Sequence, residues 1–229
     1  MIGTVLLLIG IVLPSSKTAT LRVEGRLQGI ELIIQPGEST YALGALPRAY
    51  PAQGEMVYDF GEISSSLPPL TSKRIKLFVS PEVRNLCLNF YAEFSALKIN
   101  LENIDTLKID LNSKFSSLSI EVESSQVYIL NISQLRGNSR ISGKRAEDRG
   151  DITILAGTFK ITGDLSKVSY IFNAEGSEII CTKKVTIHRM GLINRLKVAE
   201  KLNEFAGPQS ILKVYGNFNV IKLLRVEEE

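Results

Sequence analysis

The strongest constraint on how this chain folds is a series of short segments in which apolar and polar residues alternate strictly. The first is Leu86-x-Leu88-x-Phe90, and the following ones start at Leu97, Leu107, Leu118 and Val127. Successive side chains of a β-strand point to opposite faces, so each segment can bury one face and expose the other. A helix would need a period of about 3.6 residues, which these segments lack. The pattern predicts a series of short β-strands.

Two all-β architectures place short strands at this spacing: a β-sandwich and a β-solenoid. Residues 82–136 contain neither Gly nor Pro, whereas the tight hairpins of a sandwich strongly prefer Gly. Two segments are also nearly identical, LKINL at 97–101 and LKIDL at 107–111, as expected where similar coils stack. We therefore expect an all-β protein with a β-solenoid body, resembling a single-stranded β-helix, with the β-sandwich as the alternative.

The rest of the chain extends this pattern and then breaks it. Beyond Gly137 the alternation continues to Ile187 with frequent glycines. The charged stretch at 144–151 is expected to be an exposed loop. Residues 191–206 place Leu192, Leu196, Ala199, Leu202 and Phe205 at helical spacing before Gly207 and Pro208. This spacing predicts a C-terminal amphipathic helix that caps the β body.

The serial LxIxL segments, followed by glycine-punctuated ones, resemble the adhesin-type β-solenoid domains that follow an N-terminal membrane segment. The resemblance covers roughly residues 75–187 and departs from the usual family pattern in the Gly-free first half. It implies a β-solenoid fold and a role at the cell surface. The family has no catalytic motif that could be carried over to this chain.

Residues 2–13 (IGTVLLLIGIVL) form an uncharged apolar run. As a helix this run would span about 18 Å, against a membrane hydrocarbon core of about 30 Å. Its length suits the apolar region of a secretory signal, which favours an exported or membrane-tethered protein in contact with the membrane through residues 2–13. The positive charges follow the run at Lys17, Arg22 and Arg26. They fit one alternative, a short uncleaved segment that holds the protein at the cytoplasmic face of the membrane. A further alternative is that the run is a buried first strand or helix of a soluble protein.

Composition shifts suggest three parts to the chain. Residues 1–19 are expected to be the hydrophobic signal or membrane segment, and residues 20–72 a small β unit with a Pro/Gly-rich loop. Residues 73–229 then form the main β domain, which includes the helix predicted at 191–206.

Few residues suit catalysis or cofactor binding. The chain has two cysteines and one histidine, His188, which fall short of the four ligands of a structural zinc site. Cys87 and Cys181 could form one disulfide in an oxidising compartment, or remain two buried thiols. We expect no catalytic residue, no cofactor, no metal site and no enzymatic activity.

Two surface features are candidates for recognition. One is a basic patch near the C-terminus, and Asn131-Ile132-Ser133 is a sequon that has meaning if the chain is exported and the site exposed. The formal net charge of +3 is too small to predict a nucleic-acid partner. The residues of the basic patch are Lys183, Lys184, Arg189, Arg195, Lys197 and Lys201.

These observations favour a non-catalytic, exported or membrane-tethered surface protein with an adhesin-like, envelope or filament role. Self-association would use β edges, and the ligand is unknown. One alternative is a cytoplasmic, membrane-associated β-solenoid scaffold. A further alternative is an enzyme whose site the sequence does not reveal.

Overall fold

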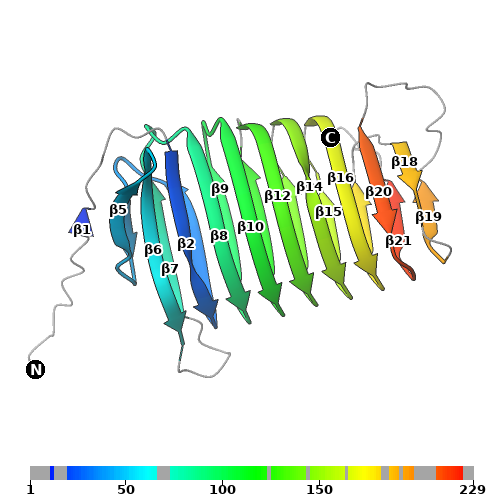
Figure 1. Ribbon diagram of the computed structural model, residues 1–229, viewed down its shortest axis with the longest axis horizontal. Coiled ribbons are helices and arrows are strands. Elements are labelled where there is room, and N and C mark those ends of the chain that lie inside the picture. The colour runs from blue at the N-terminus through cyan, green and yellow to red at the C-terminus, as the bar shows by residue number, and fades with distance from the viewer. Residues whose placement is uncertain are drawn as a thin grey trace, which may run out of the picture.

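The structure is a computed structural model. It describes residues 11–12, 20–65, 73–122, 125–142, 145–162, 165–181, 186–190, 193–198 and 210–223. Within these ranges every regular element is a β-strand. The strands form two long sheets that lie one behind the other (Figure 1). The prediction of an all-β protein is confirmed.

One sheet, sheet A, contains 11 strands within the described residues. In spatial order they are β1 (Ile11–Val12), β4 (Tyr41–Leu43), β7 (Lys73–Val79), β3 (Ile30–Pro36), β9 (Ala96–Leu101), β11 (Ser117–Val122), β13 (Asn138–Ser142), β15 (Thr158–Ile161), β17 (Glu178–Cys181), β21 (Val220–Leu223) and β19 (Arg195–Val198).

The other sheet, sheet B, contains 10 strands within the same residues. In spatial order they are β18 (Thr186–Arg189), β20 (Ile211–Tyr215), β16 (Leu165–Glu175), β14 (Arg145–Leu155), β12 (Ser125–Leu135), β10 (Thr106–Lys114), β8 (Asn85–Glu93), β2 (Thr20–Gln28), β6 (Glu55–Ser64) and β5 (Arg48–Ala52).

From β8 to β17 the chain alternates between the two sheets, and each strand pairs in parallel with the next strand of its own sheet. The register is constant, as the row Leu86, Leu107, Tyr128, Asp148 and Val168 shows. One strand of sheet B and the following strand of sheet A therefore form a repeat, whose length is at the short end of the range for stacked structural repeats. Residues of equal position in successive repeats are neighbours, about 4.8 Å apart.

The inward-facing side chains of both sheets form one continuous hydrophobic core. Aliphatic residues stack in rows through it, such as Ile99, Ile120, Ile141 and Ile161. In its C-terminal half, the rings of Phe159, Tyr170 and Phe172 pack edge to face or tilted. The alternation seen in the sequence is explained by this arrangement, because every second residue of each strand points into the core.

A sharp corner joins each sheet B strand to the next sheet A strand without a hairpin. The residue at this corner has a positive φ, a conformation that residues other than Gly, Asn and Asp rarely adopt. Phe94 (φ 48°), Phe115 (51°) and Arg136 (49°) occupy it in successive repeats. A buried serine hydroxyl follows in the first two, and Ser95 and Ser116 each donate to a carbonyl two residues earlier, at 2.8 and 2.9 Å. This device turns the chain through residues 82–136 without glycine.

Two expectations about local structure are wrong. Within the helix predicted at 191–206, the described residues 195–198 form strand β19, which pairs in parallel with β21; residues 191–192 and 199–206 lie outside the described ranges. The charged stretch 144–151, expected as an exposed loop, instead begins strand β14 at Arg145, and Asp148 within it is buried. Its backbone pairs in register with β12 and β16.

At the N-terminal end, Ile11 and Val12 pair antiparallel with β4 at the margin of sheet A. The rest of the apolar run lies outside the described residues. A search of the described residues finds no helix long and apolar enough to cross a membrane. Strands β2 and β3 pair with β8 and β9, so residues 20–36 belong to the same two sheets as the later repeats. The three-part division of the chain remains a prediction.

Candidate functional site

The solvent-facing side of sheet B, called face B, has a shallow groove of about 450 Å³ across four neighbouring strands. The strands are β8, β10, β12 and β14, each from a different repeat. Two parallel rows of polar side chains line the groove. The first row is Asn89, Asp110, Asn131 and Asp151, and the second is Tyr91, Asn112, Ser133 and Thr153.

The first row alternates amides with carboxylates. Asn131 Nδ2 donates to Asp110 Oδ1 at 2.6 Å, and Lys108 Nζ lies 3.3 Å from the second carboxylate oxygen of Asp110. These contacts fix Asp110 as an acceptor and leave the amide oxygen of Asn131 available to accept. Neighbouring members of this row lie about 4.8 Å apart on adjacent strands, so amides and carboxylates alternate at this spacing along the groove.

The second row is mainly neutral and ends in an aromatic ring. Asn112, Ser133 and Thr153 are exposed and offer both donors and acceptors. Tyr91 closes the row on the N-terminal side, and the guanidinium of Arg26 lies 5.4 Å from its ring centre. Together the rows present a flat, regular array of hydrogen-bonding groups with an aromatic side chain at one end.

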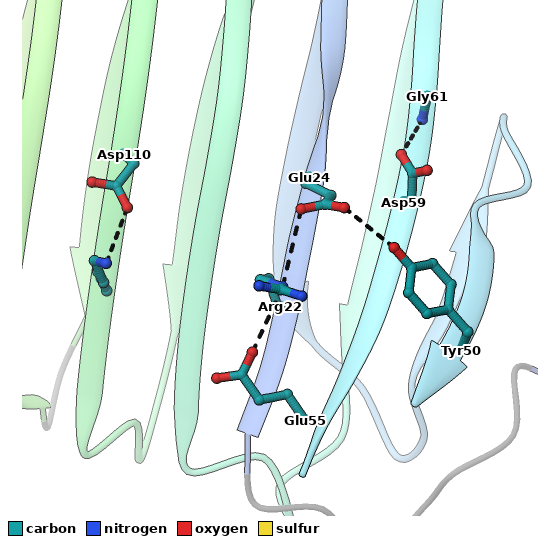
Figure 2. A network of polar contacts seen from close by, with 8 residues as sticks. Arg22, Glu24, Tyr50, Glu55, Asp59, Gly61 and Asp110 are labelled. Atoms are coloured by element: carbon teal, nitrogen blue, oxygen red, sulfur yellow. Dashed lines mark hydrogen bonds and ion pairs between the residues drawn. The ribbon is translucent and has the colours of Figure 1, made fainter. Parts of the chain in front are cut away.

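The first row continues beyond the groove into a network of ion pairs and hydrogen bonds (Figure 2). Glu24, the neighbour of Asn89, accepts a hydrogen bond from the Tyr50 hydroxyl at 3.4 Å and lies 4.0 Å from Arg22 Nε. Arg22 also lies 3.6 Å from Glu55, and Asp59 accepts from the Gly61 amide at 2.7 Å. The acidic end of the row is therefore engaged internally, and the open part is the groove.

Asn131, selected in the sequence as a sequon, is exposed on face B. It lies in the middle of the groove and is bonded to Asp110. Its glycosylation remains a prediction, and a glycan attached at this position would cover the groove.

The structure does not bring Cys87 and Cys181 together. Cys87 is in β8 of sheet B and half-buried, whereas Cys181 is buried in β17 of sheet A. Four repeats separate these strands, about 19 Å along the stack, and a disulfide needs Cα atoms within about 7 Å. No disulfide joins them. Burial, followed by the nearby charge of Glu55, raises the pKa of the Cys87 thiol.

The predicted basic patch is described only in part. Arg189 ends β18 in sheet B, while Arg195 and Lys197 are in β19 of sheet A, so the patch is divided between the sheets. Lys183, Lys184 and Lys201 lie outside the described residues, as does the side chain of His188. Among the described residues, no group of three or more His, Cys, Asp or Glu side chains could hold a metal ion.

A more extended set of cations lies on the solvent-facing side of sheet A, called face A. Its members belong to different repeats and come together only through the register of the strands. The cations at outward positions are Arg74, Lys76, Lys98, Arg140, Lys160, Lys222 and Arg195; the carboxylates at outward positions of the same strands are Glu31, Glu121 and Glu178.

Most of the carboxylate charge on face A is already paired. Glu31 is buried and contacts Arg74 Nε at 2.6 Å and Lys98 Nζ at 2.5 Å. The hydrogen bond from Lys98 is the main reason that the pKa of Glu31 lies below its usual value. Glu178 pairs with Lys222. Within the described chain, no carboxylate lies within 4.0 Å of the charged groups of Lys76, Arg140 or Lys160.

Comparison with known proteins gives little guidance. No protein-family model matches the chain, and no curated protein matches it. Among solved structures, the crystal structure of a "putative cell adhesion protein" from Clostridium sporogenes is similar, at 11% sequence identity and a TM-score of 0.36, over 90% of this chain and 92% of that one.

Proposed function

We propose that this protein is a non-catalytic binding protein that recognises an extended, polyhydroxylated polymer, a glycan, along the groove of face B. The observation that carries the proposal is the in-register pair of polar rows across β8, β10, β12 and β14. Repeated hydroxyls of a glycan need repeated donors and acceptors, which Asn, Ser and Thr supply without a charge that must be neutralised. The ring of Tyr91 offers an apolar surface for a sugar ring.

The fold proposed with this function is a β-solenoid. Support comes from the parallel pairing of each strand with its equivalent in the next repeat and from the regular alternation of the chain between the two sheets. Stacked repeats extend a binding surface along one axis, which suits a linear polymer better than a compact ligand.

We place this activity at the cell surface, in an exported or membrane-tethered protein with an adhesin-like role. The apolar run at residues 2–13 supports a tether. Self-association through β edges and attachment at the cytoplasmic face remain the alternatives.

Affinity electrophoresis of the full chain through gels containing a soluble mannan, xylan, galactan or β-glucan tests the proposed ligand class. At least one polysaccharide should slow the wild type. The variant Asn112→Ala/Thr153→Ala should lose this retardation, because it removes two groups from the second row of the groove. The matched variant Asn138→Ala/Thr158→Ala, on face A, should keep it. Free migration in all four gels, or equal loss in both variants, would contradict the proposal.

A further inference from the structure

The corner between sheets B and A exposes large apolar side chains in four neighbouring repeats, and again at Phe218, beyond Glu175 and Gly176. Phe94, Phe115 and Phe218 are 57%, 45% and 63% exposed, and Leu135 and Leu155, one residue before the corner in their repeats, are 37% and 43% exposed. We call these five residues the apolar corner. In Figure 1 it follows the lower ends of the sheet B strands, where the arrowheads of β8, β10, β12 and β14 lie. Single exposed hydrophobic residues are ordinary, but an aligned set marks an interaction site.

The apolar corner is held rigidly. The amide of Phe94 donates to the carbonyl of Lys114 at 3.0 Å, and the amide of Phe115 donates to that of Leu135 at 2.8 Å. The two rings stack with their centres 5.1 Å apart and their planes 4° from parallel. Both residues have positive φ, a conformation that Gly or Asn adopts far more readily than Phe. Stacking of the two rings offsets part of the cost of this conformation, while both side chains stay about half exposed.

Face A begins directly beyond the apolar corner. An open groove of about 570 Å³ runs along the junction, bounded by Phe94 and Phe115 on the corner side and by Ser117 and Asn138 on the face A side, with Arg136 at its end. Lys98 in β9 and Arg140 in β13 lie at the next outward positions after Ala96 and Asn138, which line this groove. An apolar edge and a basic face are thus adjacent along several repeats.

This combination matches the surface of an anionic membrane. Phenylalanine and leucine side chains enter the boundary between headgroups and acyl chains, while Lys and Arg contact anionic headgroups. Nucleic acid fits less well, because Leu135 and Leu155 cannot stack on bases and the described residues of face A place no aromatic ring between its cations from β9 to β17. The apolar corner alone or the cations of face A alone would bind a membrane weakly, and the two together would bind it more tightly.

We propose that the apolar corner and face A together dock this protein on an anionic lipid membrane. The surface goes beyond the proposed glycan-binding function, since it uses neither row of the groove, and it is separate from the apolar run at residues 2–13. Docking by this edge covers the end of face B at Leu135 and Leu155 and leaves the first row of the groove, four residues back along each strand, open to solvent. The membrane-bound protein could then hold a polymer at the same time.

Cosedimentation of the full chain with vesicles of phosphatidylcholine, with and without phosphatidylglycerol, tests the electrostatic part. The wild type should bind the anionic vesicles more tightly, and added salt should remove the difference. The variant Lys76→Glu/Arg140→Glu/Lys160→Glu should lose roughly 100-fold in affinity for anionic vesicles only. Binding through residues 2–13 would persist on both kinds of vesicle, so comparison of the two isolates the effect of face A.

A matched variant changes three cations on face B, Lys108→Glu/Arg149→Glu/Lys213→Glu. It alters the net charge equally and should keep most of the preference for anionic vesicles. An equal loss in both triple variants would mean that only net charge matters and would overturn the proposal. So would binding of duplex DNA, lost in the face A variant, with no preference for anionic vesicles.

The apolar part has its own test. Phe94→Asn/Phe115→Asn keeps residues that tolerate positive φ but removes both rings, and it should weaken binding to anionic vesicles roughly tenfold. The control Leu46→Asn/Ile171→Asn removes two exposed apolar side chains elsewhere and should change little. A Phe variant that binds as tightly as the wild type would contradict insertion of the corner, and circular dichroism would verify that every variant is folded.

Discussion

Faces A and B cover one core and are built by the same repeats, yet they differ in the balance of charge that they expose. On face B cations lie beside carboxylates, as in Arg22 with Glu24, Lys108 with Asp110, and Lys167 with Glu147. On face A carboxylates are few, and Glu31 and Glu178 are already paired. Isolated pairs of this kind add little stability, so the difference has little effect on folding, and we propose that it serves recognition.

The comparison shows how a repeat architecture creates extended rows of like side chains. Because equal positions of successive repeats become neighbours, a mild bias at one outward position becomes a row of like side chains. The position of Lys98 in β9 and Arg140 in β13 produces a basic row, and the position of Asn89 in β8 and Asn131 in β12 produces an amide-rich row. The core positions between them need only remain apolar.

The largest predicted effect comes from a substitution that disrupts the strand pairing on which both faces depend. Gly150 has φ 156°, and a Cβ at this position would lie 1.8 Å from the Leu130 carbonyl oxygen. Gly150→Val should therefore separate β14 from β12 and destabilise the protein by about 3 kcal/mol or more. Vesicle and polysaccharide binding should fall together. Thermal denaturation followed by circular dichroism measures the change, with the exposed Ser119→Ala as control; an unchanged Tm would show that the strand register differs from this one.

A smaller effect is predicted for Glu31, the buried carboxylate of face A. Glu31→Gln should cost about 1–2 kcal/mol at neutral pH, because it weakens two charged hydrogen bonds, while it adds positive charge and tightens vesicle binding. The pKa of Glu31 in the folded state is lowered from its ordinary value of 4.5. The stabilisation by this carboxylate is therefore complete above about pH 4.5 and disappears as the pH falls through the folded-state pKa.

Urea denaturation of wild type and Glu31→Gln at several pH values checks this dependence. The difference in the free energy of unfolding should shrink in acid. A difference that is constant from neutral pH to below pH 4 would exclude the proposed role of the Lys98 and Arg74 contacts.

A still smaller effect is predicted at the corner that separates the faces. Ala156 has φ 49° and Gly176 has φ 56° at equivalent corners. Ala156→Gly should raise the free energy of unfolding by up to about 1 kcal/mol by removing backbone strain, and Gly176→Ala should lower it by a similar amount. The pair forms a reciprocal test in one denaturation series. The same sign for both substitutions would contradict the left-handed geometry of the corner.

The smallest effect concerns the two cysteines. Cys87 is half-buried on face B, and its raised pKa should make it react with a thiol reagent at pH 8 more slowly than glutathione does. Glu55→Gln should speed the reaction modestly, since the charge of Glu55 contributes to the raised pKa. Cys181 is buried and should react only after unfolding. Two thiols reacting at equal rates in the native protein would contradict this placement.

Much of the fold could be predicted from the sequence because alternation reports which face of a strand is buried. The segments starting at Leu86, Leu97, Leu107 and Leu118 all lie in strands. The two wrong predictions, a helix and an exposed loop, rested on helical spacing alone or on charge alone. Arg195–Val198 fits a strand as well as a helix over four residues, and the charged residues of β14 lie in a strand whose backbone is paired on both sides.

The candidate surfaces were harder to predict, since each depends on the register between repeats. Asn131 was selected as a sequon, but its importance in the structure comes from Asp110 and Asp151, its partners in the preceding and following repeats. Lys98, Arg140 and Lys160 were missed for the same reason. Once the length of the repeat is known, aligning the repeats reveals the basic row and the amide-rich row. No comparable pattern in the sequence indicates the positive φ of Phe94 and Phe115.

Depth-dependent fluorescence on membranes tests most directly the claim that the two faces have different partners. In a Cys87→Ser background, a bimane label would be placed at Ser117→Cys on face A or at Ser169→Cys on face B, and each protein bound to anionic vesicles that contain a headgroup-attached quencher. The account predicts strong quenching of the label at position 117 and little at position 169. Equal quenching at the two positions, or stronger quenching at position 169, would contradict it.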